Sequence, residues 1–231
     1  MRLDDVQLRL GAFDLAADVT FATGQITAVM GASGSGKSTL LAAIAGFLDP
    51  AAGRIVIADR DITDLSPGDR PLSILFQDQN LFPHLTVAQN VGMGLRPDLR
   101  LSRDQIARRD SVLADVGLAG LGDRRPRDLS GGQQGRAALA RALLRDRPWL
   151  LLDEPFGALG PALRHEMLDL LEQTAAARDL SVLMVTHDPD DARRIAQQTA
   201  LIADGRVIAP TPTDALFAAP TPELRAYLGQ A

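Results

Sequence analysis

The segment Gly31-Ala32-Ser33-Gly34-Ser35-Gly36-Lys37-Ser38 lies between a short apolar run, Ile26–Met30, and a stretch with helical apolar spacing that starts at Thr39. It matches the pattern G-x-x-x-x-G-K-[ST], in which the backbone N–H groups of a glycine-rich turn surround phosphate groups. The helix that follows adds the positive end of its dipole. Glycine is needed because the backbone must approach the anion without a Cβ in the way. The segment therefore predicts a phosphate-binding loop between a strand and a helix.

Two side chains of this loop are expected to act directly on ATP. Lys37 should reach the β- and γ-phosphates, and Ser38 should offer a hydroxyl ligand to Mg²⁺. Lys37 is the only lysine among the 24 lysine and arginine residues, and the planar fork of arginine is not equivalent to a compact ammonium beside phosphates. The predicted nucleotide-binding residues here are Gly31, Ala32, Ser33, Gly34, Ser35, Gly36, Lys37, Ser38 and Thr39.

Apolar runs and helical patterns alternate over the rest of the chain. Predicted buried strands are Ile26–Met30, Leu72–Phe76, Trp149–Leu152, Val182–Thr186 and Thr199–Ala203. Predicted helices are Ser38–Ala45, Arg136–Leu144, Ala162–Ala177 and Asp190–Gln197. This alternation predicts an α/β fold with a mainly parallel sheet and helices on its faces. Near the N-terminus, the segments Val6–Leu10, Asp18–Phe21 and Ile55–Ala58 predict antiparallel edge strands instead.

The middle of the chain has a different pattern. Residues 87–147 lack strand-like runs and are rich in turn residues, so they predict a helical lobe inserted between two parts of a core, residues 1–86 and 148–231. The tail from Pro210 onward carries four prolines and one predicted short helix, which is too little for a further regulatory domain. The whole chain of 231 residues is therefore interpreted as one domain with an inserted lobe.

Composition excludes several classes of function. The net charge of −5 gives no support to a nucleic-acid partner, which usually meets a basic patch. The chain has no cysteine, which excludes disulfides, cysteine-ligated zinc and thiol catalysis. No window approaches the roughly 18 uncharged apolar residues of a membrane-spanning helix. Any link to a membrane is therefore expected to come through a partner.

Two acids follow the predicted strand Trp149–Leu152. In open α/β sheets, ligands bind beyond the carboxyl ends of the strands, where Asp153 and Glu154 would emerge. Asp153 is expected to hold the Mg²⁺ shell, and Glu154 to orient and deprotonate the attacking water. Such a pair could also mark a solvated strand end, but the presence of the phosphate loop favours the functional interpretation.

Two further polar residues end predicted strands. Gln77 follows Leu72–Phe76, where its amide could contact Mg²⁺ or water, and His187 closes the run after Val182–Thr186, where it could hydrogen-bond a terminal phosphate oxygen. Taken singly, each is better explained as an ordinary surface or capping residue. Together with Lys37 and Glu154, however, they make up the predicted catalytic set.

The order and spacing of these segments resemble the ATP-binding subunit of ABC transporters. The resemblance rests on the phosphate loop, the loop at Gln77, Leu129-Ser130-Gly131-Gly132-Gln133-Gln134, Leu150-Leu151-Leu152-Asp153-Glu154-Pro155 and Thr186-His187-Asp188. The Leu-Ser-Gly-Gly-Gln segment is the most diagnostic, because other phosphate-loop ATPases lack it. The resemblance covers nearly the whole chain and implies a P-loop NTPase core of the ABC ATPase type.

The resemblance also implies a head-to-tail dimer with two ATP molecules between the subunits. In the family, the segment corresponding to Ser130, Gly131, Gly132 and Gln133 caps the γ-phosphate of ATP held by the opposite subunit. Glu154 is then the general base, and His187 supports the γ-phosphate. The small residues at this segment also allow a helix N-terminus to meet an anion.

The chain departs from the family pattern at Gly160, and one residue that the family pattern includes is hard to place. Gly160 stands where the family usually has Asp, so communication across the dimer could be weakened or taken over by another residue. The aromatic residue that stacks on adenine near the N-terminus is hard to place. Phe13 is a candidate, but its distance from the glycine loop fits poorly, and a place in the core is the alternative.

The segments Leu75–Asn90 and Pro126–Leu129 are similar to bacterial importers. Within them, Asn80–Phe82, His84–Leu95 and the short tail resemble the ATPases of thiamine importers. That resemblance implies import of a small solute, a permease helix docked near Gln77–Leu85, an indirect periplasmic solute-binding partner and a place on the cytoplasmic face of the inner membrane. Leu81, Phe82 and Leu85 suit such docking, or they belong to the lobe core.

Three alternatives stay open. One is an importer ATPase for an inorganic anion, a metal or a polyamine. Another is a soluble ABC ATPase of DNA repair or translation, although the long coiled coils or tandem ATP domains of those proteins are absent here. The third is a degenerate domain that binds ATP only as a structural switch, an alternative that Gly160 keeps open.

Overall fold

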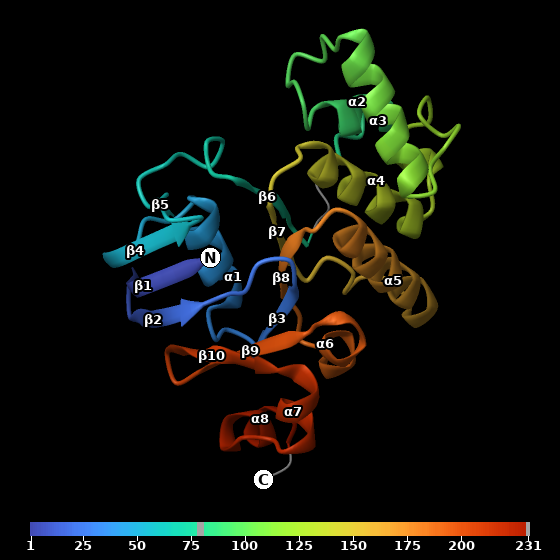
Figure 1. Cartoon of the computed structure of the whole chain (residues 1–231). Coiled ribbons are helices and arrows are strands. Elements are labelled where there is room, and N and C mark those ends of the chain that lie inside the picture. Colours follow the sequence, from blue (N-terminus) through green and yellow to red (C-terminus); the bar gives the residue numbers. More distant parts are fainter. Residues whose placement is uncertain (78–80, 230–231) are drawn as a thin grey trace.

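A curled β-sheet forms the centre of this computed structural model, which describes residues 1–77 and 81–229 (Figure 1). The strands are β1 (Arg2–Leu10), β2 (Phe13–Thr20), β3 (Ile26–Gly31), β4 (Ala52–Ile57), β5 (Arg60–Asp61), β6 (Leu72–Leu75), β7 (Trp149–Asp153), β8 (Ser181–Val185), β9 (Gln198–Ala203) and β10 (Arg206–Pro212). The helices are α1 (Lys37–Ala45), α2 (Val87–Gly92), α3 (Arg103–Asp115), α4 (Gly131–Leu144), α5 (Pro161–Ala177), α6 (Pro189–Ile195), α7 (Thr213–Ala218) and α8 (Pro222–Tyr227), with a 3₁₀ turn at Pro126–Asp128.

In the described part of the chain the strands form one sheet in the order β5-β4-β1-β2-β10-β9-β3-β8-β7-β6. The neighbours β9, β3, β8, β7 and β6 are all parallel, which confirms the predicted parallel core. At the other end, β1 pairs antiparallel with both β2 and β4, as the N-terminal segments predict. Because the parallel strands share a direction, their carboxyl ends meet at one edge of the sheet.

Side-chain alternation along the parallel strands divides the apolar interior into two clusters. Ala28 and Met30 of β3 face one cluster, while Val29 between them faces the other. Leu150 and Leu152 of β7 likewise point away from Leu151. Since both faces are covered, each strand is an uninterrupted apolar run, which is why these strands are recognisable in the sequence.

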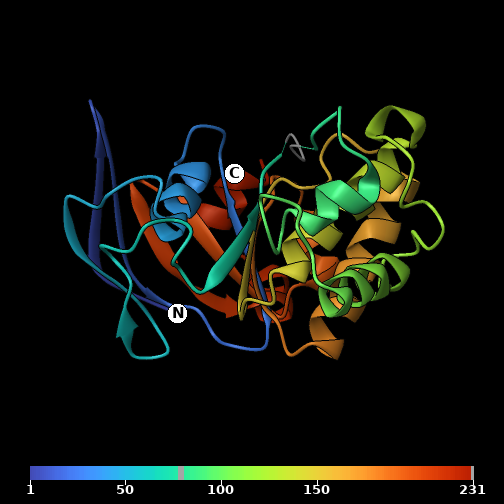
Figure 2. The same ribbon diagram turned by 90° about the horizontal axis from the view of Figure 1, so that it is seen from above.

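Helix α1 packs between the parallel strands and the antiparallel N-terminal strands, within the second cluster. Helices α4, α5 and α6 cover the opposite face of the parallel sheet with the first cluster. Helices α2 and α3 pack on α4, and these three lie together at one side of the molecule, away from β1 and β2 (Figure 2). The chain connects β6 to this helical group and returns from it through β7 (Figure 1).

Several predicted boundaries were wrong. Strand β2 begins at Phe13 rather than Asp18, because Leu15, Ala17 and Val19 alternate inward between exposed residues. Helix α4 begins at Gly131 rather than Arg136, since Ser130 caps it despite the two glycines that follow. The tail holds two short helices, α7 and α8, and the second starts at Pro222 in the first-turn position that proline tolerates.

The search for membrane spans covered the described residues. Within them, none of the helices combines the length and the apolar character needed to cross a bilayer.

Candidate nucleotide-binding site

The glycine-rich loop joins the buried strand β3 to helix α1, as predicted. Gly36 precedes the helix with φ +102°, and a Cβ there would lie 2.5 Å from Cζ of Phe13. A Cβ on Gly31 would lie 2.6 Å from the carbonyl oxygen of Ile202. Glycine is thus required at both ends of the loop, at Gly36 by the backbone conformation and at Gly31 by close packing. The loop leads directly into the N-terminus of α1, a position suited to anions.

Lys37 is the first residue of α1, and its side chain is only 7% exposed. Its Nζ donates hydrogen bonds to the carbonyl oxygens of Gly31 at 2.8 Å and Ala32 at 3.0 Å, so the ammonium lies under the loop. Burial lowers the pKa of Lys37, while the carboxylates of Glu154 and Asp153 partly oppose that effect. A cation held in this partly desolvated position interacts strongly with a phosphate placed above it.

Asp153 ends strand β7, and its Oδ1 accepts a hydrogen bond of 3.1 Å from Oγ of Ser38. A hydroxyl and a carboxylate therefore meet beside the phosphate loop, and both are hard oxygen donors of the kind Mg²⁺ prefers. Burial raises the pKa of Asp153, and the neighbouring Glu154 adds to that rise. A cation at this point would relieve the cost of the buried carboxylate, so the donors present fit Mg²⁺.

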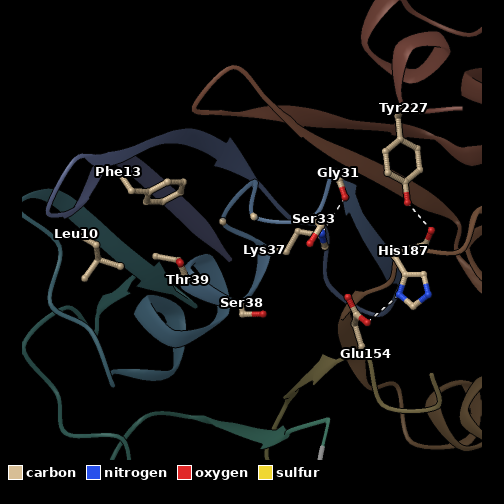
Figure 3. A pocket seen from close by; sticks show the side chains of 12 residues that line it. Leu10, Phe13, Gly31, Ser33, Lys37, Ser38, Thr39, Glu154, His187 and Tyr227 are labelled. Carbon is tan, nitrogen blue, oxygen red and sulfur yellow. Dashed lines mark hydrogen bonds and ion pairs between the residues drawn. The ribbon is translucent and has the colours of Figure 1, made fainter. Parts of the chain in front are cut away.

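Glu154 has a left-handed backbone conformation with φ +45°, which is uncommon for a residue with a long side chain. Its N–H donates to the carbonyl oxygen of Val185 on β8, so the turn is fixed by the neighbouring strand. Its carboxylate Oε2 lies 2.8 Å from Nδ1 of His187. The two side chains that the sequence places after separate strands therefore meet at the carboxyl edge of the sheet (Figure 3).

The loop that carries His187 is held by a group of buried and half-buried polar residues beneath it. Asp191 accepts hydrogen bonds from Oγ1 of Thr186 at 2.7 Å and from Nη2 of Arg164 at 2.5 Å. Nη1 of Arg164 also lies 3.0 Å from the carboxylate of Asp188. Arg164 belongs to α5, so these contacts connect the helix after Gly160 to the His187 loop.

The phosphate loop, Glu154 and His187 line one cavity of about 520 Å³ (Figure 3). Nine residues singled out in the sequence contribute to its wall: Gly31, Ser33, Gly34, Gly36, Lys37, Ser38, Thr39, Glu154 and His187. Phe13 also lines it, since the early start of β2 brings this ring against Gly36. Leu10 and Tyr227 complete the wall, and no sequence pattern pointed to either of them.

The other predicted residues lie outside this wall. Ala32 and Ser35 belong to the same loop but line a neighbouring hollow with Tyr227. Gln77 is exposed just beyond β6, which runs parallel to β7. In the expected permease-docking segment, Asp78–Asn80 lie outside the described residues, and the ring of Phe82 is 40% exposed.

The segment Ser130–Gln133 starts helix α4 and is not part of the cavity wall. Oγ of Ser130 accepts from the N–H of Gln133 at 3.3 Å, and Oε1 of Gln133 accepts from the N–H of Ser130 at 3.0 Å. This reciprocal cap stabilises the helix start. Ser130 and Gly131 are exposed, so this helix N-terminus faces outward within a single chain.

Comparisons with known proteins agree with this arrangement. The family model described as "ABC transporter" matches residues 16–157. The "Thiamine import ATP-binding protein ThiQ" of Cereibacter sphaeroides is 62% identical over 229 residues, covering 99% of each chain. The protein of the same name from Ruegeria sp. is 52% identical with the same coverage.

Solved structures give the same result for the fold. A nucleotide-free ATP-binding cassette from an ABC transporter superposes with a TM-score of 0.88 at 23% identity, over 98% of this chain and 97% of that one. A dimeric ATP-binding cassette bound to ADP and Pi superposes with a TM-score of 0.77 at 30% identity, over 92% of this chain and 98% of that one.

Proposed function

The chain belongs to the ABC transporter family of ATP-binding domains, and on that basis we propose that it hydrolyses ATP to energise thiamine import through a membrane permease. The proposal that thiamine is the imported solute rests on the 62% identity to a thiamine import ATP-binding protein over almost the full length of both chains. The proposal of ATP hydrolysis rests on the position of Lys37, Glu154 and His187, which line one cavity.

In the proposed reaction, the loop Gly31–Gly36 binds the phosphates of ATP and Lys37 neutralises charge on the β- and γ-phosphates. Oε2 of Glu154 is engaged by Nδ1 of His187, which leaves Oε1 free to accept a proton from water. The resulting hydroxide attacks the γ-phosphorus, the bond to the bridging oxygen of ADP breaks, and phosphate and ADP leave. His187 orients the base through Nδ1, and its Nε2 can donate to a γ-phosphate oxygen when the ring carries both protons.

The residues proposed to hold Mg²⁺ are Ser38 and Asp153, with Gln77 as a further oxygen donor. The 3.1 Å contact between Ser38 and Asp153 supports the first two. Among the described residues no group of three or more acidic or histidine side chains gathers to hold a metal. That suits Mg²⁺, which usually takes one or two protein ligands together with substrate phosphates and water. When bound, the ion would neutralise charge that develops on the phosphates.

For the base of the nucleotide, we propose a site between Leu10 and Phe13. Both side chains line the cavity beside Gly36 and Thr39, at the end opposite His187 (Figure 3). An aromatic ring can stack on adenine, and an apolar side chain next to it excludes water. Phe13 is therefore the residue proposed to fill the adenine-stacking role that the sequence alone left without a clear occupant.

A second copy of the chain is proposed to complete the site. Ser130, Gly131, Gly132 and Gln133 start helix α4 away from the cavity of their own chain, and their outward-facing helix N-terminus suits an anion. In a head-to-tail dimer this segment would close over the γ-phosphate bound by the partner. The dimeric cassette at 30% identity supports association into a dimer.

A permease is proposed to dock near Gln77–Leu85, where Phe82 is exposed, which would hold the subunit at the cytoplasmic face of the inner membrane. A periplasmic solute-binding protein would take part indirectly. Thiamine itself is not expected to touch this chain, so no residue is proposed as its ligand.

The test of this proposal is uptake of labelled thiamine at nanomolar supply in cells that lack the gene. We expect uptake to be lost, to return with the unchanged gene, and to stay absent with Glu154→Gln. Uptake of phosphate, a divalent metal and a polyamine is measured in the same cells as the control. Normal thiamine uptake with loss of one of those solutes would assign a different cargo. No change in any uptake would favour an ATPase unconnected with transport.

A further inference from the structure

Helix α8, at the end of the described chain, returns to the nucleotide cavity. Leu224 anchors it, because this side chain is fully buried in the same apolar cluster as β3 and β8. Tyr227 lies three residues later, on the same side of the helix. Its ring lines the cavity together with Gly31, Glu154 and His187 (Figure 3).

The hydroxyl of Tyr227 donates a hydrogen bond to the main-chain carbonyl oxygen of His187. The imidazole of that residue is the group whose Nδ1 lies 2.8 Å from Oε2 of Glu154. A hydrogen bond to the peptide of His187 limits rotation of that peptide and therefore limits the directions its side chain can take. Tyr227 thus acts on the geometry of the Glu154–His187 pair without touching either carboxylate oxygen.

Further contacts hold the residues that flank His187. Thr186 donates to Asp191 of α6, and Arg164 of α5 contacts both Asp191 and Asp188. Helix α5 therefore holds Asp188 directly and Thr186 through Asp191, while α8 holds the main chain of His187 itself. Burial, with smaller contributions from Asp188 and Glu154, raises the pKa of the Tyr227 phenol. The phenol therefore stays protonated, and able to donate, throughout the neutral and mildly alkaline range.

We propose that Tyr227 is a positioning residue of the ATPase site, whose hydroxyl holds the His187 peptide so that the imidazole faces Glu154. The C-terminal helix α8 is then part of the hydrolytic unit rather than only a cover on the sheet. This inference rests on the proposed roles of Glu154 and His187. Because Tyr227 acts through His187, its loss should slow turnover and leave the affinity for ATP nearly unchanged.

The experiment compares the full chain with Tyr227→Phe, His187→Ala and the double variant. Arg225→Ala is the matched control, since Arg225 is exposed on the same helix and lies outside the cavity wall. We expect Tyr227→Phe to lower kcat about 2- to 10-fold, the range for loss of one hydrogen bond, with KM for ATP within about twofold. Arg225→Ala should match the unchanged chain. In the His187→Ala background, Tyr227→Phe should cause no further loss.

Three kinetic results would overturn the inference, and they are distinguishable. A kcat of Tyr227→Phe equal to that of the unchanged chain, beside a slow His187→Ala, rejects the role of Tyr227 and leaves the proposed function intact. An equal loss in both backgrounds shows that Tyr227 acts independently of His187. Full activity of His187→Ala rejects the proposed role of His187 and this inference with it.

A second measurement uses the only tyrosine in the chain. Because Tyr227 has no other tyrosine beside it, a ¹³C label at the ring Cζ gives a single NMR resonance. We expect a pH titration of this resonance to show a pKa above 10, the ordinary value for tyrosine, because burial, with smaller contributions from Asp188 and Glu154, raises the pKa of the phenol. A phenol that titrates at the ordinary pKa would contradict the burial of Tyr227 against the His187 loop, on which the inference stands.

Discussion

Oε2 of Glu154 and Nδ1 of His187 lie 2.8 Å apart, although the two residues come from the ends of different strands, β7 and β8. Asp153, next to Glu154, pairs across those strands with Val185, two residues before His187. The register of the sheet therefore brings the side chains of Glu154 and His187 close together. The contact leaves one carboxylate oxygen of Glu154 to act on water. Removing the basicity of this side chain while keeping its shape is the most direct test of the proposed chemistry.

For Glu154→Gln, we expect ATP hydrolysis to fall at least about 100-fold, the lower end of what a general base contributes. ATP binding should persist, since the phosphate loop is unchanged, so the ATP-bound dimer should accumulate. Turnover is measured by phosphate release and dimerisation by size-exclusion chromatography with ATP. Glu172→Gln, on an exposed position of α5, is the matched control and should behave like the unchanged chain. Undiminished turnover of Glu154→Gln would reject the assigned base.

Lys37→Ala should weaken nucleotide binding about 10- to 100-fold, because the charge-assisted hydrogen bonds of its ammonium to phosphate are lost. The melting temperature without nucleotide should fall only slightly, because the hydrogen bonds of Nζ to Gly31 and Ala32 are lost while a charge that burial makes unfavourable in the folded chain is removed. Calorimetric titration with ATP and thermal melting measure the two effects. Lys37→Arg should bind poorly as well, because the broad guanidinium does not fit under the loop. An ATP affinity like that of the unchanged chain would exclude the predicted role of Lys37.

The sequence predicts the parallel core well, because strands buried on both faces are continuous apolar runs such as Val182–Val185. It also predicts that Lys37, Asp153 and His187 come together, since the carboxyl ends of neighbouring parallel strands share one edge. It does not reveal strand β10, whose prolines Pro210 and Pro212 argue against a strand. The structure accommodates Pro210 at an irregularity in the pairing between Ile208 and Thr211, and Pro212 at the last position of the strand, opposite Gln198.

The remaining site residues could not be found from sequence because no local pattern marks them. Tyr227 and Leu10 reach the cavity through long-range packing, of α8 on β9 and of β1 on β2. The same holds for Phe13, because β2 starts at this residue and its ring packs against Gly36, a contact that the distance along the sequence does not predict. Long-range packing, rather than residue type, places these three side chains.

Asp153→Asn should make the folded protein more stable at pH 7 and remove Mg-dependent hydrolysis. Burial raises the pKa of Asp153 above 3.8, so the ionised carboxylate costs stability in the folded chain. Between 3.8 and the raised pKa the folded state binds more protons than the unfolded state. The advantage of the Asn variant should therefore shrink as pH falls through the raised pKa and vanish below 3.8.

The measurement is thermal melting with a chelator present, from pH 7 down to pH 3. Asp123→Asn, at an exposed position, serves as the control and should give no pH-dependent advantage. A lower melting temperature of Asp153→Asn at pH 7 would mean that the carboxylate stabilises the empty fold, contrary to the sign argued for its pKa.

Arg70→Met should destabilise the fold by about 3–5 kcal/mol, because the guanidinium is fully buried and serves several main-chain carbonyls. Nη1 donates to Ala43 and Ile44 at 2.8 Å each, near the C-terminal end of α1, where a cation is favourable. Nη2 donates to Thr63 at 2.6 Å, and Nε to Leu65 at 3.0 Å. Met cannot replace any of these bonds.

Urea unfolding provides the free energies for Arg70→Met and for its control, Arg60→Met, at an exposed position on β5. The control should change stability by less than about 0.5 kcal/mol. Arg70→Lys should fall between the unchanged chain and Arg70→Met, because one ammonium cannot donate to four carbonyl oxygens in that geometry. Equal stability of the two Met variants would show that the buried guanidinium contributes nothing net.

Gly160→Asp should stabilise the chain by a few tenths to about 1 kcal/mol. Gly160 is the N-cap of α5 with φ −64° and ψ 158°, no side chain caps the helix, and a Cβ there would meet nothing within 4 Å. An Asp carboxylate can accept from the N–H of Leu163 and faces the positive end of the helix dipole. Gly160→Ala restricts the unfolded chain equally but cannot cap, so it is the control that isolates the carboxylate. If the Ala variant melts as high as the Asp variant, the gain in stability comes from the reduced entropy of the unfolded chain alone. Capping of α5 by the Asp carboxylate would then contribute nothing.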